Sequence, residues 1–171
     1  MADSKRLRIL KALTTQIKKV KPSNGYTYDL SASVSRGRPY FGRETPLPWV
    51  SILESLDPDS EPFRAGQNIS QKDLWVLLIN GWVEEDPEAS INNPTDPAHN
   101  LMAEVKKALA SIMNPGTPNN RNPDYLLGDL IEGFRMEAGT VRPPDELSAK
   151  AYFYLRVGVE VAETLTDPFA D

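Results

Sequence analysis

The chain has 171 residues with 19 Lys and Arg, 24 Asp and Glu, one histidine and no cysteine, which gives a formal net charge of -5. This length suffices for one domain that buries its own core. The absence of cysteine excludes disulfides and thiolate metal sites, and a single histidine, His99, disfavours the common zinc arrangements. Because the sequence has no signal-peptide-like start and no apolar run of about 18 residues, we expect a cytoplasmic protein that does not enter a membrane.

The charge is divided unevenly along the chain. Residues 1–43 hold 10 Lys and Arg against only Asp3 and Asp29, whereas residues 44–171 hold 9 against 22 Asp and Glu. Two interpretations stay open. The difference can be a chance property of solvated faces, or a basic surface of one copy can meet an acidic surface of the next, head to tail. The second arrangement closes into a ring.

The first part of the chain predicts a helix and two strands. Residues 4–20 predict a helix with a Ser or Asp cap, because apolar side chains recur there at helical spacing: Leu10, Leu13, Ile17 and Val20. Residues 26–35 alternate apolar and polar side chains, which predicts a half-buried strand, and another strand is expected from Trp49. We expect mobile loops at about 36–48 and 57–72, since both are rich in Gly, Pro or polar residues.

The middle of the chain predicts a buried strand and a second helix. Residues 73–85 are apolar on both faces over most of their length, which indicates a strand in the middle of a sheet. Asp96 as the N-cap and Pro97 as the first helical residue predict a helix that ends at residues 114–116, Asn-Pro-Gly.

The last part predicts one more loop and two strands. Residues 114–125 are rich in Asn and Pro and predict a mobile loop, because this composition cannot bury a core by itself. Residues 128–139 predict a strand, because apolar side chains share one face there, although Glu132 interrupts the pattern. Residues 151–163 predict another strand and show the clearest alternation of apolar and polar side chains in the sequence. The element order predicts an α+β fold in a single domain, 1–171, with a mixed, mostly antiparallel sheet of about five strands and two helices packed on one face.

A search for catalytic, cofactor and metal motifs finds no candidate site. The GRPYFG segment lacks the spacing and the lysine of a phosphate-binding loop, and His99 lies in no pattern that would pair it with a nucleophile. The acidic runs at 57–61 and 84–88 lack the glycine and the distal glutamate of a calcium loop. We therefore expect a protein that is not an enzyme and needs no cofactor.

Residues 35–44, SRGRPYFGRE, combine arginines with aromatic side chains, as nucleic-acid-binding loops do. A pI near 5.0 argues against duplex binding, because the acidic remainder of the chain would repel phosphates. Three interpretations stay open: a contact with a neighbouring protein chain, a flexible loop, or a nucleic-acid contact. The candidate contact residues in this loop are Arg36, Arg38, Tyr40, Phe41 and Arg43.

The sequence as a whole resembles the tail terminator proteins of long-tailed bacteriophages, also called tail completion or minor tail proteins. The resemblance rests on the order of six segments: RLRILKALTTQIKKV, a tyrosine-rich segment ending VSRGR, PWVSILE, WVLLINGWVEE, PAHNLMAEVKKALASI and AYFYLRVGVEV. It covers nearly the full chain and depends on pattern more than on invariant motifs, so no functional residue is carried over.

This resemblance implies a mixed α/β subunit without catalysis that forms a homo-oligomer, a hexameric ring. The ring would sit at the head-proximal end of the tail tube protein, stop tube polymerisation and offer a docking surface to the head-tail connector protein. DNA would pass through the lumen without specific binding. Such a protein is assembled in the host cytoplasm and is located in the virion, in the tail or neck.

The resemblance also suggests how the charge division would serve assembly. A basic edge on each subunit would face an acidic edge of the next, and high salt would weaken the ring. The residues expected at the basic edge are Lys5, Arg6, Arg8, Arg36, Arg38 and Arg43. Two alternatives remain: another phage neck or head-tail connector protein, such as a head-completion protein, and a nucleic-acid-binding module.

Overall fold

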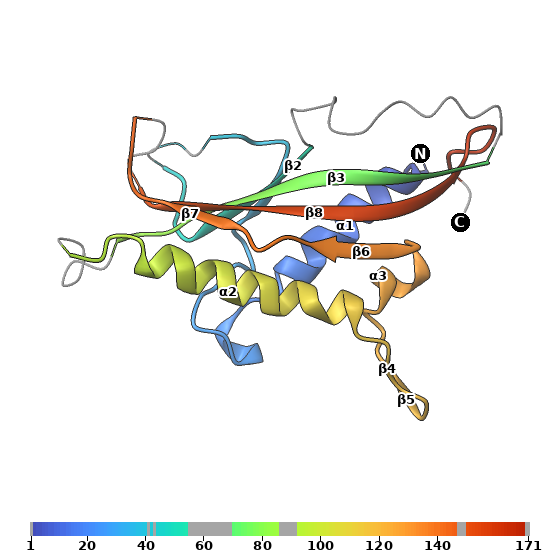
Figure 1. Cartoon of the computed structure of the whole chain (residues 1–171), viewed down its shortest axis with the longest axis horizontal. Helices are drawn as coiled ribbons and strands as arrows, with labels where there is room; N and C mark the ends of the chain where they lie inside the picture. Colours follow the sequence, from blue (N-terminus) through green and yellow to red (C-terminus); the bar gives the residue numbers. More distant parts are fainter. Residues whose placement is uncertain are drawn as a thin grey trace.

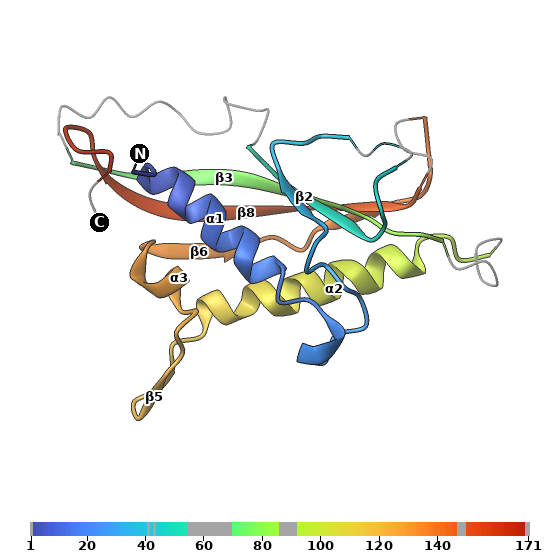
Figure 2. The ribbon, with the colours of Figure 1, turned by 180° about the vertical axis from the view of Figure 1, so that it is seen from behind.

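A computed structural model of the chain shows two layers, a sheet and a pair of helices that cover one of its faces (Figures 1 and 2). The structure describes residues 2–40, 42, 44–54, 70–85, 92–146 and 150–169. Phe41, Arg43 and most of the predicted loop at 57–72 therefore lie outside the described residues. The predicted α+β class, with two helices on one face of a mostly antiparallel sheet, is confirmed.

The main sheet contains six strands in the described part of the chain, with the order β1-β2-β3-β8-β6 and with β7 also paired to β8. These strands are β1 (Val34–Arg36), β2 (Trp49–Glu54), β3 (Ser70–Trp82), β6 (Gly133–Met136), β7 (Thr140–Arg142) and β8 (Tyr152–Thr164). The pairs are antiparallel except for β1 and β2, which run parallel. A separate hairpin consists of β4 (Gly116–Thr117) and β5 (Asn120–Arg121).

The helical elements are α1 (Lys5–Ile17), α2 (Asp96–Ala110), the single turn α3 (Leu126–Asp129), and the 3₁₀ turns η1 (Pro22–Asn24) and η3 (Ser111–Met113). Helix α1 begins where the sequence predicted, because the Ser4 hydroxyl accepts a hydrogen bond from the Leu7 N–H. Helix α2 begins one residue earlier than expected: Thr95 occupies the N-cap, and Asp96 lies in the first turn. No helix in the described residues has the length and apolar character needed to cross a membrane.

The long strands β3 and β8 form the centre of the sheet. They pair antiparallel over their full length, from Ser70 opposite Thr164 to Trp82 opposite Tyr152, which is about 40 Å at the usual rise of a strand. The predicted central position of residues 73–85 is confirmed. The expected loop at 57–72 extended too far, because Ser70 already belongs to β3.

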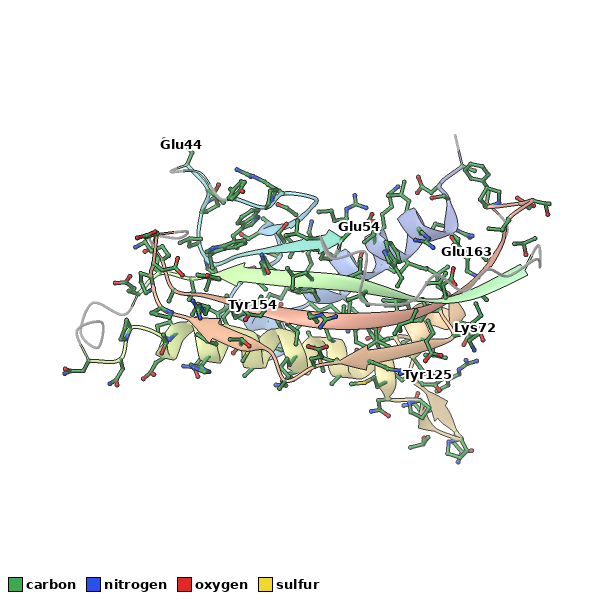
Figure 3. All side chains as sticks on the ribbon, turned by 45° about the horizontal axis from the view of Figure 1, so that its top comes forward. Glu44, Glu54, Lys72, Tyr125, Tyr154 and Glu163 are labelled. Carbon is green, nitrogen blue, oxygen red and sulfur yellow. The ribbon has the colours of Figure 1, made fainter. Side chains whose placement is uncertain are left out.

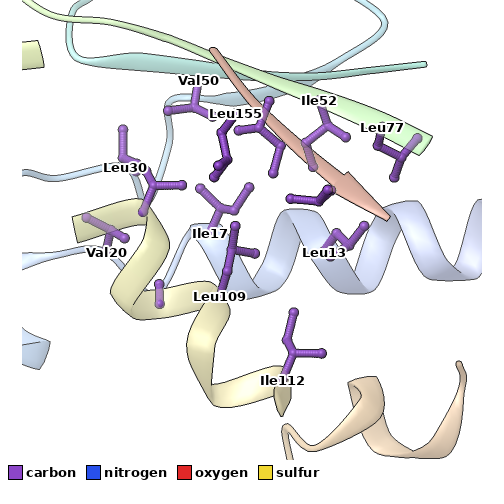
Figure 4. Close-up of a cluster of buried hydrophobic side chains, with 14 of the residues drawn as sticks. Leu13, Ile17, Val20, Leu30, Val50, Ile52, Leu77, Leu109, Ile112 and Leu155 are labelled. Atoms are coloured by element: carbon purple, nitrogen blue, oxygen red, sulfur yellow. The ribbon is translucent and has the colours of Figure 1, made fainter. Parts of the chain in front are cut away.

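The core lies between the sheet and the two long helices (Figure 4). Alternate residues of the strands point toward the helices and are nearly inaccessible to solvent, as are the apolar stripes of α1 and α2. The central members of this cluster are Leu13, Ile17, Val50, Ile52, Leu77, Leu109, Ile112 and Leu155. Each fully buried aliphatic side chain of this size contributes about 1.5–3 kcal/mol to folding.

The predicted strand at 26–35 is wrong except for its last residues, which belong to β1. The backbone N–H groups of Thr27 and Tyr28 donate to the Glu104 carboxylate at 2.7 and 3.0 Å instead of to a neighbouring strand. Hydrogen bonds from the hydroxyl and N–H of Ser31 hold the Asp29 carboxylate in a local turn and lower its pKa. The alternation arises because this segment packs against the helices without pairing.

Two further expectations differ from the structure. The segment 114–125, expected to be a mobile loop, contains the β4–β5 hairpin, whose base is held by Asn122 hydrogen bonds to the carbonyls of Ser111 and Asn114 at 2.8 and 2.9 Å. The strand expected at 128–139 is shortened to β6, because α3 before it is a left-handed turn with positive φ at each of its residues. Strand β7 was not predicted.

We predict that Gly81→Ala destabilises the protein by about 1–3 kcal/mol, because the new methyl carbon would lie 2.2 Å from the buried Phe153 ring and force it to move. Gly42→Ala is the matched control, since its methyl carbon would meet only Thr45 Oγ1 at 4.0 Å, and should change stability by less than about 0.5 kcal/mol. Urea unfolding measures both. Equal midpoints for the two variants would contradict the packing described here.

Candidate subunit interface

The loop between β1 and β2 is held against the sheet face that faces away from the helices by a stack of three side chains. Trp49 and Trp82 lie opposite each other on β2 and β3, with ring centroids 4.9 Å apart and planes 19° from parallel. The Arg38 guanidinium lies over the Trp49 ring at 5.0 Å from its centroid. Both indoles are buried but Arg38 is exposed, so this cation–π contact contributes about 0.5–1 kcal/mol, as at other exposed sites.

Hydrogen bonds fix the loop on both sides of this stack. The Trp49 Nε1–H donates to the Ser35 hydroxyl at 2.8 Å, and Arg38 donates to Thr45 Oγ1 at 3.1 Å. Thr45 Oγ1 also accepts from the Gly42 N–H at 3.0 Å. In its described residues, the loop at 36–48 is therefore attached to the sheet by these contacts, and its expected mobility stays a prediction.

The loop presents Tyr40 and Arg36 to solvent. Tyr40 is 77% exposed, the largest exposed fraction of any large hydrophobic residue in the described part of the chain. Arg36 ends β1, is exposed, and forms no ion pair with another described residue. Figure 3 shows that Glu44, on the same loop, stands well away from the sheet. Two of the predicted contact residues are thus available to a partner.

The basic residues of the N-terminal helix are placed differently. Arg6 forms an ion pair with Glu163 at 3.0 Å and lies 5.1 Å from the centroid of the Trp75 ring. The Lys5 N–H donates to the Pro168 carbonyl at 3.0 Å, and Arg8 is half-buried. These contacts attach the start of α1 to the C-terminal end of the chain.

The expectation of one continuous basic edge is wrong. Trp75, under Arg6, and Trp82, in the Arg38 stack, are seven residues apart on β3, about 23 Å at the usual rise of a strand. The structure therefore does not bring the two groups of basic residues together. Part of the N-terminal charge is also neutralised within the chain, by Arg6 with Glu163 and by Lys19 with Asp124 at 2.5 Å.

A shallow groove of about 280 Å³ lies on the same sheet face as the loop, at the opposite edge of the sheet. It is lined by residues of β3, β6 and β8 and by the residue after β6: Leu74, Val76, Arg135, Met136, Glu137, Arg156, Val157 and Gly158. The floor is mostly apolar and the rim is charged. No described helix covers this face (Figures 1 and 3).

Ion pairs between neighbouring strands cross the rim of the groove. Arg135 pairs with Glu160 at 2.5 Å, and Arg156 pairs with Glu137 at 3.4 Å. All four side chains keep some contact with solvent, so each pair contributes little to stability. Their effect is to leave the face without a strong net charge, which lowers the cost of bringing another protein surface against it.

The apolar pattern of β3 is the only sequence feature that relates to this groove. Both faces of residues 73–85 are apolar, which predicted a strand in the middle of the sheet. Leu74, Val76 and Leu78, on one of these faces, are only half-buried and face away from the helices. An apolar strand face without a helical layer is one of the features found at surfaces that bind other proteins. The Trp49–Trp82 stack could not be predicted from the sequence, because it depends on the register between β2 and β3.

A second hollow, of about 490 Å³, includes Glu84, Glu85 and Asp96, and Glu84 is bound to Lys150, whose pKa this hydrogen bond raises. His99 is exposed on α2. Among the described residues, no three histidine or carboxylate side chains gather closely enough to hold a metal ion.

No protein-family model matches the sequence, and no curated protein matches it.

We predict that Arg38→Ala exposes the indole stack and increases acrylamide quenching of tryptophan fluorescence, with a loss of about 0.5–1 kcal/mol in unfolding free energy. Arg36→Ala is the control, because Arg36 contacts neither indole in the structure. Its quenching should equal that of the unsubstituted chain. If Arg38→Ala also leaves quenching unchanged, the guanidinium does not hold the loop.

Proposed function

We propose that this protein is a ring-forming structural subunit of a bacteriophage tail, a tail terminator that ends the tail tube at its head-proximal side. The observation that carries the proposal is the sheet face opposite α1 and α2. It bears a half-buried apolar groove and a fixed loop with an exposed tyrosine, and no described helix covers it (Figure 1). A patch of this kind on a small domain fits a surface that is covered after assembly.

The resemblance to tail terminators supports the same conclusion, since it rests on the order of segments along the chain. The described structure adds that the loop and the groove lie at opposite edges of one sheet. A protein with different contact surfaces on two sides assembles head to tail, and such contacts form a ring when the rotation closes.

A nucleic-acid-binding module is a weaker candidate. Arg6 and Arg38 are each engaged with an indole of their own chain and are poorly placed to bind phosphates. The net charge of -5 also gives no general attraction to a duplex. Under the proposal, DNA passes through the ring without specific binding.

The direct test is the solution mass across a range of concentrations, together with an assay of tube growth. We expect a species of six times the 19.0 kDa of one chain to form as concentration rises. When added to the polymerising cognate tube protein, it should bind one tube end and stop growth there. Binding to a portal-side protein and not to the tube would favour another neck protein, and a single-chain mass at every concentration would overturn the proposal.

A further inference from the structure

We propose that Tyr40 of one copy inserts into the groove between β3, β6 and β8 of the next copy, and that Arg36 pairs with Glu137 across this contact. The inference rests on the proposed function, because it assigns the two surfaces that would meet in the ring. Neither the resemblance nor the sequence pattern identifies the groove.

Tyr40 has the properties of an interface anchor. It is 77% exposed although it is aromatic, and it lies two residues from Arg38, which is fixed over Trp49. Because the described loop is already held by hydrogen bonds, binding would order few additional groups. Tyrosine and arginine are also among the residue types that contribute most to binding at protein interfaces.

The groove is suited to one aromatic side chain. Leu74 and Val76 supply apolar surface, and the Leu74 side chain packs over Gly158, where an added methyl carbon would lie 3.0 Å from Leu74 Cδ1. The volume of about 280 Å³ lies just below the range of about 300–1,000 Å³ that is usual for small-molecule sites. The groove therefore has room for a single inserted side chain.

One ion pair can form between the two surfaces. Arg36 has no ion-pair partner among the described residues, and the Glu137 side chain on the groove rim is 59% exposed. The present partner of Glu137, Arg156, is at 3.4 Å and is itself 44% exposed, so Glu137 can accept a second donor. Such an ion pair at the rim would determine how the two subunits are oriented, and it would add little to the affinity of the contact.

The positions of the two surfaces favour a ring over a symmetric dimer. The Tyr40 loop follows β1 at one edge of the sheet, and the groove includes β6 at the other edge. A contact between different patches is heterologous, so every subunit keeps one loop and one groove for its two neighbours. If the open face of one subunit instead packed on the same face of another, the result would be a closed two-fold dimer.

The absence of cysteine permits a direct test by cross-linking. Pro39→Cys and Arg135→Cys place one thiol beside the Tyr40 anchor and one on the groove rim of an otherwise full chain. A short bismaleimide should join them between copies and give a ladder of covalent oligomers on denaturing gels. The control pair, Met113→Cys with Arg135→Cys, uses another exposed site on the helix side and should give no ladder. A ladder no stronger than that of the control would overturn the inference.

Substitutions at the anchor give a second, independent measurement. Tyr40→Ala should weaken association by about 30-fold or more, whereas Tyr40→Phe, which keeps the ring, should stay within a few-fold of the unsubstituted chain. Arg36→Glu and Glu137→Arg should each weaken association, and the double variant should recover most of it. Sedimentation equilibrium measures these changes, and circular dichroism verifies that each variant is folded.

The outcomes separate this inference from the proposed function. If the hexameric mass persists in Tyr40→Ala and no ladder forms, the ring stands and this pairing of surfaces is wrong. If the unsubstituted chain has a single-chain mass at all concentrations, both fail.

Discussion

The antiparallel pairing of β3 with β8 is the constraint on which the rest of the structure depends. These strands are the longest in the sheet and match residue for residue over their whole length. Their register places one set of side chains, including Leu77 and Leu155, against α1 and α2. A shift by one residue would move that set to the opposite face, so the core strongly favours a single register.

The pairing of β3 with its two neighbours also determines what the other face presents. At one end of β3, the register between β2 and β3 places Trp82 beside Trp49, and the stack holds Arg38 and thereby the loop that carries Tyr40. Farther along the strand, the register between β3 and β8 places Leu74 and Val76 beside Gly158 in the groove. The two pairings of β3 therefore produce both the core and the two surfaces that we assign to assembly. The helices shape only the inner face.

The sequence predicted the elements that are defined by their own side-chain pattern and missed those defined by distant partners. Alternation at 151–163 corresponds to β8, but similar alternation at 26–35 arises from packing against helices, with Glu104 as the partner of the backbone N–H groups. In the candidate site, Tyr40 and Arg36 are exposed, and their contact with a partner stays a prediction. The separation of Arg6 from Arg38 could not be predicted, because it depends on which ends of the sheet α1 and the loop reach.

The most direct test of the central claim is a cryo-electron microscopy reconstruction of the assembled protein. The account predicts a closed ring with sixfold symmetry, in which the loop after β1 of each subunit contacts the β6 edge of its neighbour and Tyr40 fills the groove. A two-fold particle with the open sheet faces packed on each other, or a ring in which the groove stays open to solvent, would contradict it.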